Sequence, residues 1–536
     1  MARRPTVIGP PATDKLLGAL PVVAGFAARL DIAGIIDRAC PIRDLATLRH
    51  GQVIEALIAN RLTSPRALVH VADWARTWAV SEVFGADPDA LNDDRIGRAL
   101  DALAPVLEQV VGSVGLSAIA AFGLDVSRLH WDMTSISLFG AYPNTDDDFA
   151  TPRFGHPKDR RTDLKQIQAG LAVTGDGAIP ILAKIYDGGA AEVSQVAGAM
   201  ESLATMAGER RLLIVGDSKL VSYPNLAAMI NAGVDFIAPA SKTYVPAATL
   251  ARCELADAAA VAYLAERDSA KKPQARGSYR VSEDTMTLTG RHKRDRPLIL
   301  RRIFVHSTAR AGAAVSARTK KLDRARDDLH RLGRGLGGRH YPTPAAVTAR
   351  VAAIAANRRV GAYLHTQISQ DHTAKPTLAW YFDQSALDTE AATDGWYTLL
   401  SNLDPDQADA AEILRRYKGQ EAVERRYGAF KGPLAVAPLF LHSNRRIHAL
   451  LGVICLALLI FCLIERHVRL AIAPQNKLDG LWAHRPAKPT GRLIFAALSG
   501  LRLQPAHGPD PPQIPQPPPL PTRILQLLDI DPTQPR

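Results

Sequence analysis

A change of hydrophobic pattern near residue 125 constrains the fold of this 536-residue chain more than any other feature. Residues 1 to about 120 have apolar side chains at helical spacing, as in Val53–Leu62 and Ile96–Val111. Beyond them the pattern becomes β-rich, with a helix expected at Glu192–Ala207 and strands expected at Leu129–Leu138, Ile167–Thr174, Ile179–Ile185 and Leu212–Val215. Successive strands followed by helix and strand predict an α/β fold with a mixed sheet, preceded by an all-α N-terminal domain.

The middle of the chain interrupts this pattern. Polar strands are expected around Thr285–Thr289 and Leu298–Val305, followed by a basic helical stretch from Ser316 to Arg359 with eleven Lys or Arg against three Asp. The segment Gly395–Leu400 then restores the strand pattern. We therefore predict a helical domain at 1–120, the first part of the core at 121–245, an insertion domain at 246–390, the second part of the core at 391–475, and a Pro-rich C-terminal tail at 476–536. The tail is expected to be extended and mobile from Gln504 to Thr522.

Charge and apolar runs restrict the partners and the compartment. The formal net charge of +12 and the pI near 9.6 favour a polyanionic partner, and nucleic acid fits best. The four cysteines show no paired metal-ligand spacing, which is typical of a reduced cytoplasmic protein. The apolar run Ala449–Ile464 is shorter than the roughly 20 residues that a bilayer requires, so a buried helix and no membrane partner are expected.

Three acidic residues are placed where their carboxylates can converge. Asp132 and Asp217 each follow a short β-prone run, a position from which a strand presents a carboxylate at a sheet edge. Glu424 lies in an expected helix from Arg415 to Lys431. There Tyr417, Glu424 and Lys431 follow one another at steps of seven residues and share one helix face.

Three carboxylates suit Mg²⁺, because it is a hard cation that takes oxygen ligands, and Mn²⁺ is a possible substitute. Two such ions can activate a hydroxyl nucleophile and stabilise the leaving oxygen in phosphoryl transfer. Asp132 would bridge both ions, with Asp217 completing one site and Glu424 the other. Each acid also has an ordinary structural alternative: a turn cap for Asp132, a turn residue after a strand for Asp217, and an ion pair with a neighbouring Arg for Glu424.

The spacing around Glu424 carries a resemblance to a known family. Tyr417, Glu424 and Lys431 fit the pattern Y-x2-R-x3-E-x6-K, so the chain resembles the DDE-class insertion-sequence transposases of the Tyr/Arg/Glu/Lys (YREK) group. The segments Gly155–Gln166 and Leu91–Leu100 also resemble that family, which extends the similarity from about residue 15 to residue 470. The resemblance implies a ribonuclease H-like core with an insertion between the second Asp and the Glu. It also implies metal-dependent DNA strand cleavage and transfer at terminal inverted repeats.

The same resemblance implies the DNA contacts. Tyr417, Lys431 and the residue at position 420 would contact DNA, but this chain has Gln420 where the pattern has Arg. Nearby cations can take the place of that Arg, namely Lys418, Arg425 and Arg426. The partners would be double-stranded DNA, both terminal inverted repeats and target DNA, bound by a homodimer in the end complex. The helical N-terminal domain at 1–120 would bind the DNA ends and mediate oligomerisation. The expected location is the bacterial cytoplasm, in association with the nucleoid.

Two other functions remain as alternatives. One is a metal-dependent DNA nuclease on the same core, which cuts without joining. The other is a transposase-derived DNA-binding protein that no longer catalyses.

Two further motifs are interpreted as structural. Gly333–Gly338 matches G-x-G-x-x-G but follows a charged helical stretch, so a helix-ending loop is expected and not a dinucleotide site. Trp396 lies in a strand pattern, which favours core packing over stacking on an unpaired base.

Overall fold

The computed structural model describes residues 14–42, 46–143, 146–155, 157, 160–190, 192–208, 211–265, 268–269, 271–434, 439–504, 512–531 and 533. The protein is mixed α/β, as predicted, and divides into two compact units. Unit 1 consists of residues 1–220, 228–235 and 419–536, and unit 2 of residues 221–227 and 236–418.

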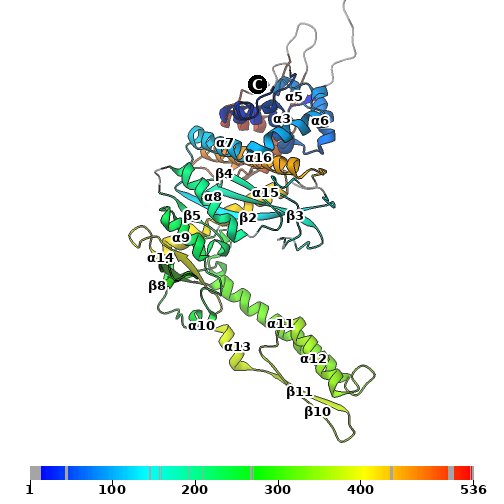
Figure 1. Ribbon diagram of the computed structural model, residues 1–536, viewed down its shortest axis with the longest axis vertical. Helices are drawn as coiled ribbons and strands as arrows, with labels where there is room; N and C mark the ends of the chain where they lie inside the picture. The colour runs from blue at the N-terminus through cyan, green and yellow to red at the C-terminus, as the bar shows by residue number, and fades with distance from the viewer. Residues whose placement is uncertain are drawn as a thin grey trace, which may run out of the picture. The chain divides into compact units, whose positions relative to one another are not determined.

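Unit 1 contains the predicted helical segment, the first four strands of the predicted core and the C-terminal part of the chain (Figure 1). Its helices are α1 (Leu20–Arg29), α2 (Ile32–Ala39), α3 (His50–Thr63), α4 (Val71–Thr77), α5 (Val80–Phe84), α6 (Asp93–Leu103), α7 (Leu107–Phe122), α8 (Glu192–Ala207), α15 (Glu421–Lys431), α16 (Asn444–Ala471), α17 (Gly491–Leu498) and α18 (Pro519–Leu527). Its strands are β1 (Lys15–Leu16), β2 (Arg128–Leu138), β3 (Lys165–Thr174), β4 (Pro180–Tyr186), β5 (Leu213–Val215), β13 (Leu478–Trp482), β14 (Arg485–Ala487) and β15 (Arg502–Leu503).

The sheet of unit 1 has the order β4-β3-β2-β5. Strand β2 pairs antiparallel with β3 and parallel with β5, so the sheet is mixed, as predicted. The β3–β4 hairpin turns at Gly177, whose φ of +78° suits glycine. The four strands and helix α8 lie where the sequence pattern predicts them, within about two residues.

Helix α16 is the central core element of unit 1. It is apolar around most of its circumference, and it packs on β4 and α15 as well as on the N-terminal helices α1, α3 and α6. Figure 1 shows it (orange) between these blue helices and the strands. Two helical stretches, Asp93–Phe122 and Asn444–Ala471, are long and apolar enough to span a membrane, but 94% of the most apolar window of the second is buried. The prediction of a buried helix is therefore confirmed.

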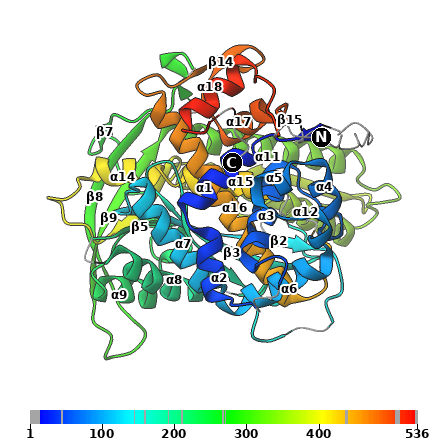
Figure 2. The same cartoon turned by 90° about the horizontal axis from the view of Figure 1, so that it is seen from above.

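The C-terminal segment is folded, in contrast to the predicted tail. Strand β15 pairs with β1, and α17 and α18 pack beside α16 (Figure 2). Helix α18 begins with Pro519, since proline suits the first helical turn, and it buries Ile524 and Leu525. The predicted extended stretch from Gln504 to Thr522 is thus wrong for its last residues, while residues 505–511 lie outside the described part.

Unit 2 contains the predicted insertion. Its helices are α10 (Ala247–Leu250), α11 (Thr308–Arg334), α12 (Pro344–Arg358), α13 (Gln384–Ala391) and α14 (Ala410–Lys418), and its strands are β7 (Ala259–Val261), β8 (Tyr279–Leu288), β9 (Leu298–Ser307), β10 (Leu364–Gln370), β11 (Pro376–Phe382) and β12 (Trp396–Ser401). Helix α9 (Tyr223–Asn231) and strand β6 (Asp235–Pro239) contain residues of both units. Short 3₁₀ helices lie at Leu68–His70, Pro88–Ala90, Ala104–Val106, Ser218–Leu220 and Pro273–Ala275.

The insertion extends further along the chain than predicted. Strand β12 was expected in the second part of the core, but all six of its residues pair antiparallel with β9. It lies between β6 and β9 in the strand order β6-β12-β9-β8-β7. Trp396 is buried and lies 5.1 Å from the His306 ring, which confirms core packing. Helix α11 ends at Arg334, before Gly335, as expected for a helix-ending loop.

Candidate active site on strands β2 and β5

The parallel pairing of β2 and β5 sets the first two acids at one level. His130 is the register partner of Val215. Asp132 follows His130 by two residues, and Asp217 follows Val215 by two residues, just beyond the end of β5. Because neighbouring strands lie about 4.8 Å apart, Asp132 within β2 and Asp217 just beyond β5 follow adjacent register positions.

The face of β2 that carries Asp132 is the face covered by helix α15. Side chains alternate along a strand, so His130 and Asp132 project to the same side. The imidazole Nδ1 of His130 lies 3.1 Å from Oε1 of Gln420, the residue that precedes α15. The Asp132 carboxylate therefore emerges beneath this helix, and it is 9% exposed.

Helix α15 is bound to the backbone of β2 at two points. The Gln420 side-chain amide Nε2 donates a hydrogen bond to the Trp131 carbonyl at 3.0 Å. The Tyr427 hydroxyl donates to the Asp132 carbonyl at 2.5 Å and also contacts the Ala169 carbonyl of β3 at 3.3 Å. Glu424 lies between these residues in the sequence, and its side chain is exposed.

The carboxylates also have local partners. The Asp132 carboxylate accepts from the Met133 N–H at 2.8 Å, and that of Asp217 accepts from the Lys219 N–H at 2.9 Å. The hydrogen bond from the Lys219 N–H fits the alternative expected for Asp217, that of a turn residue after a strand. Oxygen donors of this kind suit a hard cation, but no three His, Cys, Asp or Glu side chains of the described residues gather closely enough to hold a metal ion. Asp132, Asp217 and Glu424 are therefore not gathered into one metal-binding group here.

His130 is a neutral member of this site that the sequence analysis missed. Burial lowers the pKa of His130 to about 4; the hydrogen bond that its ring makes to Gln420 opposes this shift, and nearby Arg128 adds to it. Since the Gln420 Nε2 is used by the Trp131 carbonyl, Oε1 accepts from Nδ1–H of the imidazole. Strand alternation from Asp132 was the only signal in the sequence that could have found His130.

The expected helix from Arg415 to Lys431 is two helices. Helix α14 ends at Lys418 in unit 2, and α15 begins at Glu421 in unit 1, so Tyr417 does not share a helix face with Glu424. Glycine at 419 weakens the helix here. Within unit 2 the Tyr417 ring lies 6.4 Å from that of Tyr397, and the Lys418 ammonium lies 4.6 Å from the Tyr279 ring centre.

The residues predicted to contact DNA are in different environments. Arg425 and Lys431 are exposed on α15, and Lys431 is two turns from Glu424 as expected. Arg426 is only 7% exposed: its guanidinium pairs with Glu465 at 3.0 Å and donates to the Ala178 carbonyl. The structure does not support Arg426 as a DNA contact, because α16 and the β3–β4 turn enclose it. The oxygen and the nitrogen of the Gln420 side-chain amide are hydrogen-bonded to His130 and to the Trp131 carbonyl, in contrast to the expected phosphate contact.

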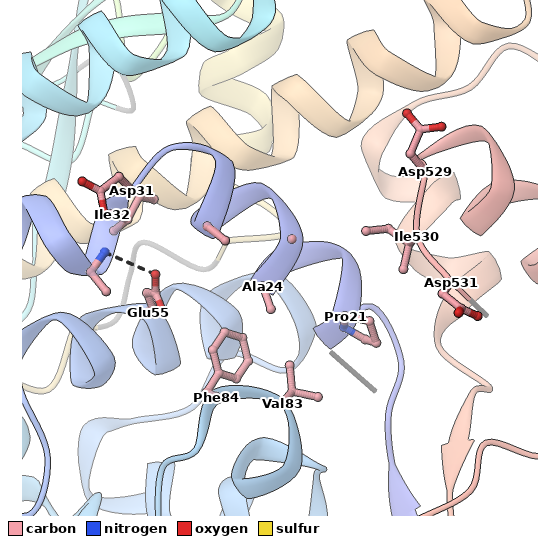
Figure 3. Close-up of a pocket in the computed structure, with 13 residues that line it drawn as sticks. Pro21, Ala24, Asp31, Ile32, Glu55, Val83, Phe84, Asp529, Ile530 and Asp531 are labelled. Carbon is pink, nitrogen blue, oxygen red and sulfur yellow. Dashed lines mark hydrogen bonds between the residues drawn. The ribbon is translucent and has the colours of Figure 1, made fainter. Parts of the chain in front are cut away.

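Two observations lie away from these acids. In the segment Gly155–Gln166, residues His156, Lys158 and Asp159 lie outside the described residues. A cavity of about 570 Å³ is lined by α1, by residues of α2, α3 and α5, and by the segment Asp529–Asp531 (Figure 3). None of the three candidate acids lines it, so it is not the candidate active site.

Comparisons with known proteins cover the chain unevenly. The family model described as a domain of unknown function, DUF4277, matches residues 12–109, within the helical N-terminal part of the chain. No curated protein matches the chain. Among solved structures, the cryo-EM structure of a piggyBac transposase synaptic complex with hairpin DNA is similar at 9% identity and a TM-score of 0.35, over 89% of this chain and 79% of that chain.

Proposed function

We propose that this chain is a DDE-class transposase with a ribonuclease H-like core. It would cleave DNA at the terminal inverted repeats of its insertion sequence and transfer the strand to target DNA. The observation that supports the proposal is the parallel register of β2 and β5, which pairs His130 with Val215, two residues before Asp132 and Asp217 respectively. Helix α15, which carries Glu424, is bound to β2 at that level.

Asp132, Asp217 and Glu424 would hold Mg²⁺, with Mn²⁺ as a substitute. The ions supply activation of a hydroxyl nucleophile and stabilisation of the leaving oxygen. The chain itself orients the site: Tyr427 and Gln420 hold α15 on β2, and neutral His130 adds no charge beside the carboxylates. Arg425 and Lys431, exposed on α15, would meet DNA phosphates.

The partners and location follow as proposals from the same function. Tyr417 and Lys418 would approach DNA from unit 2. The end complex would be a homodimer on paired double-stranded ends, in the bacterial cytoplasm. The net charge of +12 supports a polyanionic partner.

Cleavage of DNA ends by acid variants tests this function. Asp132→Asn, Asp217→Asn and Glu424→Gln should each slow strand cleavage roughly a thousandfold, equivalent to about 4 kcal/mol of transition-state stabilisation, while the chain stays folded and still binds DNA. Asp176→Asn is the control. This acid lies in the β3–β4 turn of unit 1 and pairs with Arg466 of α16, so its replacement should leave the cleavage rate unchanged. The substrates are duplexes carrying the inverted repeats that flank the reading frame.

Two results would count against the proposal. Near wild-type cleavage by any of the three acid variants in Mg²⁺ removes that residue from the site. Cleavage without joining of the cut strand to a second duplex favours the nuclease alternative.

A further inference from the structure

The hairpin of β10 and β11 in unit 2 is a two-stranded sheet with one packed face. Its strands pair antiparallel, from Leu364 opposite Phe382 to Gln370 opposite Pro376. Side chains alternate along a strand, so Ile368 and Leu378 share one face, and both pack on the apolar core formed by α11 and α12. Figure 1 shows the hairpin beside α12. The packing of this inner face on two helices holds the hairpin in place.

The opposite face of the hairpin, called here the outer face, is exposed. It consists of the alternate residues of both strands, namely His365, Gln367, Ser369, Thr377, Ala379 and Tyr381. All but Thr377 are exposed, and Tyr381 is exposed to 62%. The face contains no Asp, Glu, Lys or Arg, and five of its six side chains carry a hydrogen-bonding group. It is therefore an uncharged surface that can donate and accept hydrogen bonds.

The cross-strand pairs leave Gln367 as the projecting group of the outer face. At one end of the face the His365 ring stacks on that of Tyr381 at 5.1 Å, and at the other the hydroxyls of Ser369 and Thr377 lie 2.7 Å apart. Between these pairs Gln367 lies opposite Ala379, whose methyl group offers no hydrogen bond. The long amide side chain therefore stands at the centre of the face.

The segment that carries this uncharged face is strongly basic. Residues 316–382, from within α11 to the end of β11, contain twelve Lys or Arg against four Asp and no Glu, which gives eight of the chain's twelve net positive charges. In the hairpin turn the Lys375 side chain lies against Gly337 of the α11–α12 loop, which also carries Arg339. An uncharged hydrogen-bonding face among cations complements a polyanion that has hydrogen-bonding groups between its charged groups.

We infer that the outer face reads base edges in the major groove of duplex DNA, with Gln367 as the residue that determines specificity. The major groove, about 12 Å wide, admits a two-stranded ribbon whose strands lie about 4.8 Å apart. A glutamine placed there pairs with adenine through N6 and N7. Duplex RNA does not fit, because its major groove is deep and narrow.

This inference rests on the proposed function, since the duplex is the terminal inverted repeat. The hairpin adds a contact to those expected of the N-terminal helical domain. Cations of the same segment would bind phosphates, which position the duplex without specifying its sequence.

Purines of the inverted-repeat duplex replaced one at a time by 7-deazapurines test the contact, because this change removes only the N7 acceptor in the major groove. Binding of the full-length chain is measured for wild type and Gln367→Ala. The variant should bind the unmodified repeat about 5- to 100-fold more weakly than wild type. At one adenine the 7-deaza change should weaken binding of the wild type and have no further effect on the variant.

Binding to a scrambled duplex of equal length separates base reading from phosphate contact. Gln367→Ala should bind it like wild type, and the slope of log K against log salt should not change, because Gln367 neutralises no phosphate. Thr366→Ala is the control on the same strand, since Thr366 lies on the inner face opposite Trp380. Gln384→Ala is the control for residue type, because its amide donates to Asp388 within α13. Both controls should keep the wild-type affinity for the two duplexes.

The outcomes distinguish the inference from the function beneath it. If wild type prefers the inverted repeat and Gln367→Ala keeps that preference and every 7-deazapurine response, the hairpin does not read bases and the proposed function stands. If wild type binds the inverted repeat and the scrambled duplex alike, the proposed function fails and the inference falls with it. Wild type that prefers the repeat but responds to no 7-deazapurine also overturns the inference, without any variant.

Discussion

Single residues in this protein take their chemistry from neighbours that are distant in the sequence. His130 is neutral because the sheet and α15 bury it, and Arg426 keeps its charge in the core because Glu465 pairs with it. A cation of this kind, once buried, is costly to leave unpaired. The signature segment around Glu424 therefore has two sides: a buried one that holds the helix and an exposed one that presents Glu424, Arg425 and Lys431.

Acid should destabilise the protein through its buried histidines, and His448 of α16 provides a test. Burial lowers the pKa of His448 below its ordinary 6.5, partly offset by Glu108, and its Nδ1 has no hydrogen-bond partner among the described residues. Because the folded-state pKa is the lower one, this contribution to stability is present above pH 6.5 and is lost as the pH falls below it. His448→Leu should therefore lose less stability than wild type between pH 7.5 and 5.5 in urea unfolding.

Thr205→Ala, at an exposed residue of α8 that carries no titrating group, provides the control for that experiment and should follow the wild-type pH profile. An identical pH profile for His448→Leu and wild type would show that this histidine is not held neutral by the fold.

Among the helices, α15 and α16 differ in how much free space lies beside a glycine in each. A Cβ at Gly452 of α16 would lie 2.3 Å from the Leu107 side chain of α7, whereas a Cβ at Gly428 of α15 would meet nothing within 4 Å. Gly452→Leu should therefore destabilise unit 1 by about 1–3 kcal/mol through overpacking. Gly428→Ala should stabilise it by up to about 1 kcal/mol through helix propensity.

Melting temperatures of the two variants test this difference, with wild type as the reference. Shifts in opposite directions are expected. A higher melting temperature for Gly452→Leu would mean that α7 and α16 are less tightly packed than their backbones indicate.

At the scale of the whole molecule, part of the net positive charge lies along one face of helix α11. Helix α11 of unit 2 carries the exposed cations Lys320, Arg324, Arg331 and Arg334 at helical spacing, opposite its buried Leu329. The Arg331 guanidinium forms an ion pair with the Asp328 carboxylate at 3.3 Å. The neighbouring Arg326 guanidinium forms one with the Asp323 carboxylate at 2.7 Å. Under the proposed function this face of α11 would hold DNA phosphates without reading bases.

Salt dependence of DNA binding tests the α11 surface. Arg324→Gln and Arg334→Gln should weaken binding to all duplex sequences alike and reduce the slope of log K against log salt by about 0.9 for each phosphate that is no longer neutralised. Arg485→Gln, which removes an equal charge from an exposed position of β14, is the control and should not change the slope. If all three variants change the slope equally, net charge and not this surface governs binding.

The sequence by itself determined the elements whose pattern is local. Alternation and apolar runs predicted β2 to β5 and α8, and the all-round apolar character of α16 predicted its burial, because periodicity reports directly which faces avoid water. The same local pattern predicted Asp132 and Asp217 at strand ends, but Asp132 lies within β2, and only the register of β2 with β5 showed that both acids follow one register pair by two residues.

The tertiary structure alone decided what depends on distant partners. The helix break before Glu421 places Tyr417 with the tyrosines of unit 2, while Gln420 binds a strand 289 residues away. The C-terminal segment was expected from its prolines to be extended, yet Ile524 and Leu525 fold α18 onto α16. Spacing along a chain records which face of an element is apolar, but not which other element covers it, and for that reason the position of Glu424 relative to Asp132 had to come from the packing of α15 on β2.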